Sequence, residues 1–440
     1  MQLYLARLAE VRYDRPNLYF SEVTESKMNK KLEFISLFSG AGGLDIGFEL
    51  AGWECLYASD IDKFSVETLQ SNKGRKVGKV TLFADAVIEK MDIRELSGKE
   101  ILKKITRKKG EVPLLVGGPP CQSWSSAGHQ LGFEDPRGQL FKDYVRIASE
   151  TGVRWLVFEN VRGLLTARGA DGKPGSALEH IRKILLEAGF QTEVELLNAA
   201  DYGVPQRRVR LVLIGYKSGD RPPFPRPTHT KSSTPLSEKL PPWVSLATCL
   251  AKLSALTTEE IIRPNAALEA QLANLSPGSG VKSPGKQETT RPGGHWGYKQ
   301  GAFVADTALA ARTVTAGGQQ DWIKDPKLGL RRLAPRECAA IQTFPSNWKF
   351  SGKRSDHYRQ VGNAVPPLLA YSIACELKNH ILAALENTPK KEKHTTLSPL
   401  RSSLLAAVEY TINDERRNGE SRKRVAPRRI SRIAELSKTS

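Results

Sequence analysis

Short apolar runs alternate with amphipathic segments through residues 31–215, and this alternation restricts the possible fold more than any other feature of the sequence. Each run has the length of a strand and ends in turn or polar residues. Buried strands that are separated by helices imply a mostly parallel sheet covered on both faces. We therefore expect an α/β, doubly wound sheet. Its strands are predicted at 33–38, 54–59, 113–118 and 154–159, and its helices at 44–52, 140–150 and 176–190.

The pattern changes towards the middle of the chain. The segments 191–199 and 208–216 alternate more strictly and lie close together, so they are predicted to form an antiparallel edge. Seven prolines follow within 217–242, and seven glycines with three prolines lie within 276–301. Because this composition does not continue a doubly wound pattern, we expect a second, smaller and irregular domain that is rich in loops.

The end of the chain is basic. Helical patterns return at 335–344 and 365–385, whereas 411–440 is charged and expected to be mobile, with at most one basic helix. The formal net charge is +19, and residues 414–440 hold nine Lys and Arg against four acidic residues, so most of the excess lies in the body. This charge indicates a polyanionic partner, most simply nucleic acid, although a soluble protein can be basic without one.

The cysteines and the lack of apolar spans indicate a compartment. The five cysteines lie at least 37 residues apart and form no CxxC pair, so we expect neither a disulfide framework nor a metal site. No run approaches the length of a membrane span, and the N-terminus lacks the features of a secretory signal. We therefore expect a location in the reducing cytoplasm.

One cysteine follows an unusual turn. In 114-LLVGGPPCQSWSSAG-128, an apolar strand runs into two glycines and two prolines before Cys121. Proline fixes φ and removes a donor, so this segment is predicted to be a stiff turn at the carboxyl end of a strand. Ligand chemistry in open α/β sheets lies at that edge. The alternative is a small buried hydrophobic residue, which describes most free cysteines.

The first strand leads into a glycine-rich turn, 38-FSGAGGLDIG-47. Such a turn lets a ligand approach the backbone at a helix N-terminus, although a tight turn alone has the same pattern. It is not a dinucleotide fingerprint, because Asp45 stands where a carboxylate would oppose a pyrophosphate. Asp60 ends the second strand and can accept both ribose hydroxyls. A nucleoside without a pyrophosphate, such as S-adenosylmethionine, satisfies both observations.

Two further motifs carry charges near the same edge. Glu159 in 158-FENVRG-163 is either a desolvated functional acid or an ordinary partner of Arg162. Arg208 and Arg210 are two residues apart on a predicted strand and therefore share a face. Such a pair suits anion or base binding, or else lies on a solvated edge strand.

Together these motifs resemble the cytosine-5 DNA methyltransferases across roughly 33–215 and 331–380, in the family's order. FSGAGG, YASDID and MDIREL are similar to the family's cofactor, ribose and adenine loops, and GGPPCQSWS is similar to its nucleophile loop. FENVRGL resembles the glutamate motif, and LNAADYGVPQRRVRLVLIG resembles the arginine motif. DPRGQLF, LAPRECAAIQTFP and YRQVGNAVPPLLA resemble the remaining conserved segments of the family. The resemblance implies a Rossmann-like, S-adenosylmethionine-dependent methyltransferase domain.

The resemblance also implies roles for individual residues. Cys121 matches the nucleophile, Glu159 the acid that grips the cytosine edge, and Arg208 and Arg210 the pair that helps to hold the base. Two departures are Ile61, where many relatives carry an aromatic residue beside adenine, and Trp124, where Phe is common. The implied contacts with the cofactor, which is expected without a metal, are Phe38, Ser39, Gly40, Gly42, Gly43, Asp60, Ile61, Asp92, Ile93, Pro120, Leu140, Asn363 and Val365.

The chemistry of these residue types agrees with that assignment. Carbon 5 of cytosine is a poor nucleophile until a group adds to carbon 6, and a thiolate is well suited to this addition. Nearby arginines favour the thiolate, and a buried, partly protonated glutamate suits the ring nitrogen. Because the ring is reached from its face, the base must leave the duplex stack.

The implied organisation is an extension at 1–30, a catalytic domain at 31–216 and 331–385, a target-recognition domain at 217–330, and a basic tail at 386–440. The resemblance favours a bacterial restriction-modification enzyme, expected to be monomeric, that acts on double-stranded DNA. A companion endonuclease would act on the same site. The alternative is a tRNA cytosine-5 methyltransferase of the same fold, and a dinucleotide oxidoreductase is disfavoured by Asp45. Candidate DNA contacts are Gln122, Ser125, Gln206, Thr313, Thr315, Gly317 and Gly318.

Overall fold

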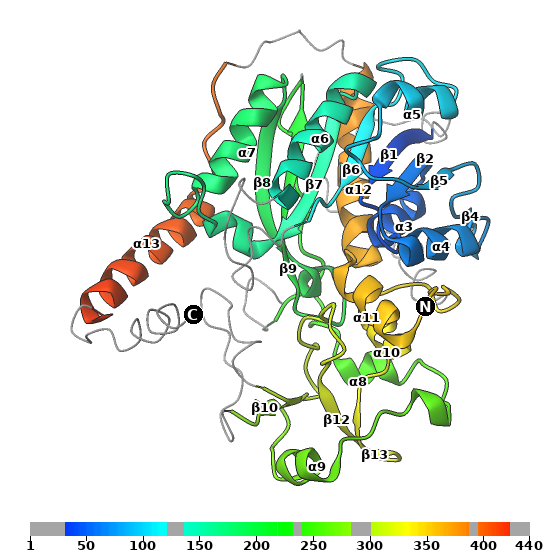
Figure 1. Ribbon diagram of the computed structural model, residues 1–440, viewed down its shortest axis with the longest axis vertical. Helices are drawn as coiled ribbons and strands as arrows, with labels where there is room; N and C mark the ends of the chain where they lie inside the picture. Colours follow the sequence, from blue (N-terminus) through cyan, green and yellow to red (C-terminus); the bar gives the residue numbers. More distant parts are fainter. Residues whose placement is uncertain are drawn as a thin grey trace, which may run out of the picture.

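The structure, a computed structural model, describes residues 31–120, 136–217, 219–231, 240–282, 301–386 and 395–422. A large lobe is built around a seven-stranded sheet, and a smaller lobe around a four-stranded sheet (Figure 1). From one edge to the other, the strands of the large sheet are β5 (Val87–Lys90), β2 (Trp53–Asp60), β1 (Leu32–Leu37), β6 (Leu114–Gly117), β7 (Trp155–Val161), β9 (Val209–Tyr216) and β8 (Gln191–Asn198).

The connectivity of the large sheet confirms the doubly wound prediction. Strand β1 lies in the middle and pairs in parallel with β2 on one side and β6 on the other. The pairings β2–β5 and β6–β7 are also parallel, whereas β9 is antiparallel to both β7 and β8. From β1 the chain first adds strands towards one side of the sheet (β2, β5) and then crosses over to add strands on the other side (β6, β7). The switch point of the topology therefore lies between β1 and β6. Ligands bind at such a switch point in open α/β sheets.

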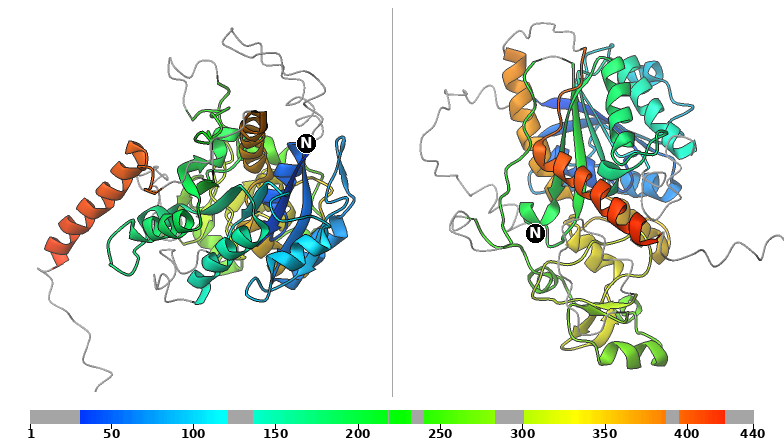
Figure 2. Two further views of the ribbon diagram at one scale, coloured as in Figure 1. Left: turned by 90° about the horizontal axis from the view of Figure 1, so that it is seen from above. Right: turned by 90° about the vertical axis from the view of Figure 1, so that its left-hand side faces the viewer.

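Helices cover both faces of this sheet, and each face has its own apolar cluster. Successive strand residues alternate between the two, because Phe34 belongs to one cluster and Ile35 to the other. On one face lie α3 (Gly43–Leu50), α4 (Lys63–Asn72) and α12 (Pro367–Glu386), and on the other lie α5 (Gly98–Lys104), α6 (Pro136–Thr151) and α7 (Ser176–Glu187) (Figure 2).

After the small lobe the chain returns to the large lobe, where α12 packs against α3. Gly47 allows these two helices to approach closely. A Cβ atom on Gly47 of α3 would lie 2.4 Å from Ala370 Cβ and 2.5 Å from the Pro367 carbonyl oxygen of α12. Only glycine fits at this crossing. The segment after residue 331 is therefore an integral part of the large lobe.

The small lobe has short strands and its own small core. Leu272, Leu275, Val304 and Trp322 form an apolar cluster there. Its strands are β10 (Ser279–Gly280), β11 (Phe303–Val304), β12 (Trp322–Asp325) and β13 (Gly329–Arg332), and its helices are α8 (Leu246–Leu250) and α9 (Ala266–Ala273). The remaining elements are β3 (Lys76–Val77), β4 (Val80–Thr81), η2 (Arg162–Thr166), η3 (Ala199–Tyr202), η4 (Thr258–Glu260), α10 (Pro335–Ile341) and α11 (Arg354–Asn363).

The last helix differs from the expectation of a mobile tail. Helix α13 (Ser402–Arg422) begins on the large lobe and extends away from it (Figure 1). Leu404 is only 2% exposed and belongs to the same cluster as Leu164 and Leu165. Before the helix, the Thr396 carbonyl accepts from Gln191 Nε2 at 2.9 Å. The segment 395–408 is therefore docked, because Leu400, Leu404, Ala407 and Val408 join the cluster.

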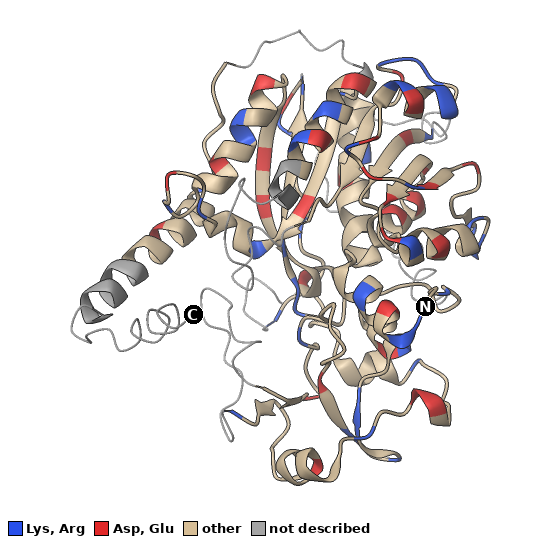
Figure 3. Cartoon of the chain, viewed as in Figure 1, with Lys and Arg blue, Asp and Glu red and all other residues tan. Residues whose placement is uncertain are grey.

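Charge is spread over the described surface. Lys and Arg occur in both lobes and do not gather on a single element (Figure 3). Within the described residues, no helix is both long enough and apolar enough to cross a membrane.

Candidate active site

The carboxyl edge of the large sheet brings together motifs that are distant in the sequence. The glycine turn follows β1, Asp60 ends β2, Pro119 follows β6, and Glu159 lies near the end of β7. Strand β9 runs the opposite way, so its first residues reach the same edge, where Arg210 pairs with Val161 in the register. The topology thus places the acid, the arginines and the glycine turn at one edge, with β6 between the glycine turn and the acid.

The glycine turn is a tight loop with an open outer side. Phe38 has a φ of 56°, Gly40 a φ of 54° and Gly42 a φ of 85°. The Gly42 amide donates to the Ser39 carbonyl at 2.9 Å, and Ser39 Oγ lies 2.8 Å from Ser36 Oγ. A Cβ atom on Gly40 would meet no other atom within 4 Å. A ligand can therefore approach the backbone at Gly40, just before the N-terminus of α3.

Asp60 ties this turn to the next loop. Its carboxylate accepts from the Gly40 amide at 2.8 Å and from the Asp62 amide at 2.8 Å. Burial raises the pKa of Asp60, against the lowering effect of these two hydrogen bonds. Ile61 is 59% exposed, which is unusual for a large apolar side chain. A carboxylate and an exposed apolar side chain in sequence suit a ribose and its attached base.

The next candidate loop lies beyond β5. Asp92 accepts from Arg94 Nε at 3.0 Å, and this hydrogen bond holds the pKa of Asp92 below its usual range. Ile93 is buried, and its carbonyl accepts from Arg146 Nη2 of α6 at 2.8 Å. Leu140 is half-buried at the start of the same helix. Helix α6 therefore fixes this loop beside the sheet.

The segment 358-YRQVGNAVPPLLA-370, called the closing motif below, reaches the glycine turn from the other end of the chain. A Cβ atom on Gly43 would lie 2.2 Å from the Val365 carbonyl oxygen, so the two backbones touch. Val365 is buried, whereas Asn363 at the end of α11 is exposed. The two segments that carry predicted cofactor residues, 38–47 and 358–370, thus touch at Gly43 and Val365.

Glu159 and the two arginines form a buried charge cluster. Arg210 Nε lies 2.9 Å from Glu159 Oε1, and both side chains are 12% exposed. Burial raises the pKa of Glu159, and the positive charges of Arg210 and Arg208 oppose that rise. The partner of Glu159 is therefore Arg210 and not Arg162, which was the alternative that the sequence left open.

Arg208 has a different environment from Arg210. It is fully buried, and its guanidinium donates to the carbonyls of Val314 at 2.9 Å, Gly362 at 2.7 Å and Ala364 at 2.9 Å. These carbonyls belong to the segment before β12 and to the closing motif. Arg208 therefore joins three parts of the chain while it contributes positive charge at Glu159.

The turn that leads to Cys121 lies next to Glu159. A Cβ atom on Gly118 would lie 3.1 Å from Glu159 Oε2, and Asn160 Nδ2 donates to the Pro119 carbonyl at 3.1 Å. Sequence reasoning gave Asn160 no role, although it stands in the quoted glutamate motif. Pro120 ends this described segment, so Cys121, Gln122 and Ser125 lie outside the described residues.

A family model for C-5 cytosine-specific DNA methylases matches residues 32–379 of the chain. The chain belongs to this family. It is therefore a DNA cytosine-5 methyltransferase, and the matched family does not favour the tRNA alternative.

Named relatives resemble this methylase over most of their length. It is 33% identical to the Type II methyltransferase M.FnuDI of Fusobacterium nucleatum, across 83% of this chain and 99% of the relative. It is also 33% identical to M1.HphI of Haemophilus parahaemolyticus, across 78% of this chain and 86% of the relative. A prophage-encoded E. coli protein, described as a DNA modification methyltransferase, aligns with a TM-score of 0.60 at 20% identity, over 80% of this chain and 99% of that one. At this identity the structural likeness supports the fold alone.

The candidate DNA contacts of the methylase divide into exposed and buried residues. Thr313 is exposed and Thr315 half-exposed, and Gly317 and Gly318 are exposed on the same short segment. Gln206 differs, because it is fully buried, its Nε2 donates to Gln342 Oε1 at 2.7 Å, and its Oε1 accepts from the Val314 amide at 2.8 Å. Gln206 is therefore a support for this segment and not a DNA contact.

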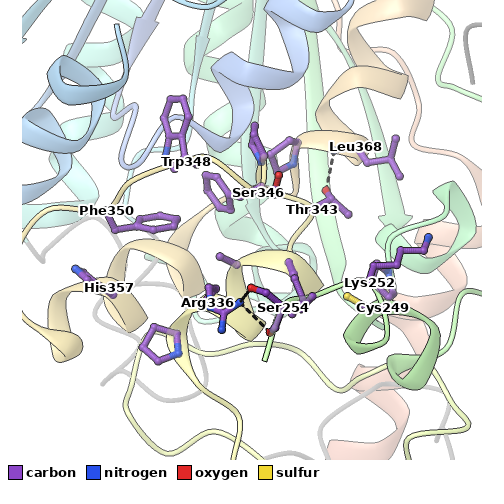
Figure 4. Close-up of a pocket in the computed structure, with 18 of the residues that line it drawn as sticks. Cys249, Lys252, Ser254, Arg336, Thr343, Ser346, Trp348, Phe350, His357 and Leu368 are labelled. Atoms are coloured by element: carbon purple, nitrogen blue, oxygen red, sulfur yellow. Dashed lines mark hydrogen bonds between the residues drawn. The ribbon is translucent and has the colours of Figure 1, made fainter. Parts of the chain in front are cut away.

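A separate cavity of about 680 Å³ lies where α3, α8, α10, α11 and α12 meet (Figure 4). Phe344, Trp348 and Phe350 line it, together with the ion-paired Arg336. None of the predicted catalytic or cofactor residues contributes to its described lining. The large volume therefore does not identify the candidate active site, which is recognised by its charges and its place on the sheet.

Proposed function

We propose that this methylase transfers the methyl group of S-adenosylmethionine to carbon 5 of a flipped-out cytosine in a specific duplex DNA sequence, through a covalent bond to Cys121. The observation that carries this proposal is the buried Glu159–Arg210 pair at 2.9 Å, beside the turn that precedes Cys121. Burying a charge pair costs hydration, and a carboxylate with a perturbed pKa at the carboxyl edge of such a sheet is a candidate substrate-binding group.

The residues at and beside the glycine turn fit the proposed cofactor. Gly40 faces open space, Asp60 is oriented by two amides, and Ile61 is exposed beside it. Asp60 would accept the ribose hydroxyls, and Ile61 would cover the adenine in place of an aromatic ring. When bound, the cofactor supplies an electrophilic methyl group. The proposed contacts of Asp92, Ile93, Pro120, Leu140, Asn363 and Val365 complete this site.

The residues of the chain carry out the remaining steps. The Cys121 thiolate adds to carbon 6 of the cytosine, and the arginines nearby favour that thiolate. Glu159 donates a proton or a hydrogen bond to ring nitrogen 3, because burial raises its pKa and keeps a larger fraction protonated. Arg210 orients Glu159 from 2.9 Å. Once carbon 5 carries the methyl group, its proton passes to solvent, and that electron pair forms the double bond between carbons 5 and 6. The bond between carbon 6 and sulfur breaks, which restores the thiolate, and a proton on nitrogen 3 returns to Glu159.

We infer that sequence specificity resides within 217–330. In support, this segment includes most of the small lobe, and the exposed residues of 313–318 lie on a short connection that Arg208 and Gln206 hold in place. Grafting 217–330 from a relative of different specificity should change the methylated sequence. Sequencing the products of a random duplex library measures this, and an unchanged target would refute the assignment.

We also infer that the enzyme protects bacterial DNA in the cytoplasm against an endonuclease that cuts the same site. The Type II relatives support this inference. Expression of the methylase in bacteria should make their DNA resistant to that endonuclease, once the methylated sequence is known.

The covalent step has a direct test. A duplex with 5-fluorocytosine at the target, together with S-adenosylmethionine, should trap the wild-type enzyme in a complex that survives denaturing electrophoresis, because fluorine does not leave as a proton does. Cys121→Ser should form no such complex, since a neutral hydroxyl is a much weaker nucleophile.

The other cysteines provide matched controls for this test. Cys375→Ser and Cys249→Ser should still be trapped, as should serine variants of the buried Cys55 and Cys338 if they fold. Trapping of Cys121→Ser, or the absence of trapping for the folded wild type on its proper site, would refute the mechanism.

A further inference from the structure

Two half-buried arginines flank strand β7, one at its amino end and one at its carboxyl end. Arg154 precedes the strand, and Arg162 follows it as the first residue of η2. Both are partly removed from water, but they differ in what surrounds the guanidinium. Arg154 lies over the Trp155 ring, with Cζ 5.0 Å from the ring centroid. Such stacking compensates part of the lost hydration.

Arg162 has no comparable compensation. Within the described part of the chain, its side chain makes no hydrogen bond, ion pair or ring contact. Burial lowers the pKa of Arg162, and no carboxylate offsets that effect. Its five N–H donors are partly shielded from water by this half-burial and remain available to a ligand.

The nearest acid in the sequence is already paired. Glu159, three residues before Arg162, is bound by Arg210, and Arg208 adds a second positive charge beside it. This end of β7 therefore has more positive than negative charge. An anion from outside the protein would neutralise the excess.

The backbone that carries Arg162 is held firmly. Leu164 and Leu165 of η2 are buried in one apolar cluster with Leu404 of α13. Gly175, which precedes α7, lies close to both, because a Cβ atom there would be 3.5 Å from the Leu165 carbonyl oxygen and 3.1 Å from Val408 Cγ1 of α13. The backbone from which Arg162 extends is thus packed against the large lobe, so only the side chain has to be ordered when an anion binds.

We propose that Arg162 binds a backbone phosphate of the substrate DNA next to the target cytosine. A planar guanidinium donates two parallel N–H groups to one phosphate, which suits an arginine without an internal partner. This inference rests on the proposed function, because it assumes that the target base enters beside Glu159. The cofactor also carries a carboxylate, but Asp60 and the glycine turn lie at β1 and β2, beyond β6 from Arg162.

Arg162→Gln tests the proposal, with Arg154→Gln as the matched control at the opposite end of the same strand. Duplex binding is measured by fluorescence anisotropy from 50 to 300 mM salt. Loss of one phosphate contact should reduce the slope of log Kd against log salt by about 0.9 and weaken binding about 10-fold at low salt. Arg162→Lys should recover part of the affinity, and Arg154→Gln should behave like the wild type.

Calorimetric titration with S-adenosylmethionine separates the two possible anions. An unchanged cofactor Kd in Arg162→Gln, with a raised KM for DNA, supports the phosphate contact. A weaker cofactor Kd with an unchanged salt slope would assign Arg162 to the cofactor carboxylate and overturn the proposal, as would a wild-type salt slope in Arg162→Gln. Failure of the wild type to methylate any duplex would instead refute the proposed function.

Discussion

The large sheet carries ion pairs both where its parallel strands begin, here the amino edge, and where they end, the carboxyl edge, but the pairs differ in burial. At the amino edge, Arg107 pairs with Glu33 of β1 at 2.6 Å, with side chains 34% and 23% exposed, and Lys31 pairs with Glu54 of β2 at 3.6 Å. At the carboxyl edge, the Glu159–Arg210 pair is much more deeply buried. Both edges have ion pairs, so counting them does not distinguish the edges.

Burial does distinguish them. A partly exposed pair contributes roughly 0–1 kcal/mol and costs little to form, so the amino edge uses its charges for solubility and minor stabilisation. A buried pair loses hydration that its attraction repays only in part. Burial alone does not mark a substrate site, because Arg331 of β13 and Glu337 of α10 form a pair that is buried more deeply, with both side chains 4% exposed. The Glu159–Arg210 pair differs in its place, beside the turn that leads to Cys121 at the carboxyl edge.

The largest expected difference between the edges is catalytic. Glu159→Gln keeps the shape of the side chain but removes the proton donor, so methyl transfer to the target duplex should fall about 10²- to 10⁴-fold. The matched variant Glu33→Gln removes a carboxylate from the amino edge and should change the rate less than about twofold. Single-turnover rates with saturating cofactor measure both, and equal losses would contradict the comparison.

The pH dependence of folding stability tests the protonation of the buried Asp45. It lies in the first turn of α3, is fully buried, and burial raises its pKa from 3.8 to about 7. Between these values the folded protein binds the proton more tightly than the unfolded chain, so stability decreases as the pH rises. At 1.36 kcal/mol per pKa unit, this decrease is on the order of 4 kcal/mol and is complete above about pH 7.

Asp45→Asn has no proton to lose, so it should become more stable relative to the wild type from pH 4 to pH 8. Urea unfolding at pH 4, 5.5 and 8 measures the difference. Burial raises the pKa of Glu49 to about 8, and Asp45 adds to that rise, so Asp45→Asn should lower the pKa of Glu49 and increase the difference at high pH in the same direction. A difference that stays constant with pH would show that Asp45 ionises normally in the folded protein.

Much of the large lobe was predictable from local pattern. The buried strands read as apolar runs, and the structure places the predicted ones within one or two residues of their expected limits. Strand β5, 87-VIEK-90, was missed because it is a half-exposed edge strand with only two apolar residues. Helix α11 was missed because its core contacts come from Tyr358 and Val361 between polar residues.

The sequence indicated which residues belong to the candidate site, but not which groups they contact. The spacing of Arg208 and Arg210 predicted a shared face, but the carbonyls that Arg208 contacts come from segments more than 100 residues away. No local pattern encodes such contacts. Gln206 was misassigned for the same reason, since its partner Gln342 is 136 residues distant.

The docked start of α13 gives a smaller test, now of stability. Leu404 is 2% exposed and Leu405 is 44% exposed, although they are neighbours on one helix. Leu404→Ala should lower the free energy of unfolding by about 2–5 kcal/mol, and Leu405→Ala by less than about 0.5 kcal/mol. Urea titrations measure both, and similar values would show that α13 is not part of the folded large lobe.

The smallest effect is expected from the end of the chain. Residues 414–440 carry nine Lys and Arg against four acidic residues, so removing them should weaken DNA binding at low salt and reduce the salt slope by roughly one to three. If the carboxyl edge and the small lobe select the site, the truncated enzyme should methylate the same sequence, because phosphate contacts carry no direct sequence information. Anisotropy titrations measure the salt slope, and library sequencing measures the methylated sequence.

A full-length variant with these cations changed to glutamine should give the same salt slope as the truncation, since charge alone is responsible. A changed target sequence in either protein would mean that the tail takes part in recognition, and the carboxyl edge would then not be sufficient to define the substrate site.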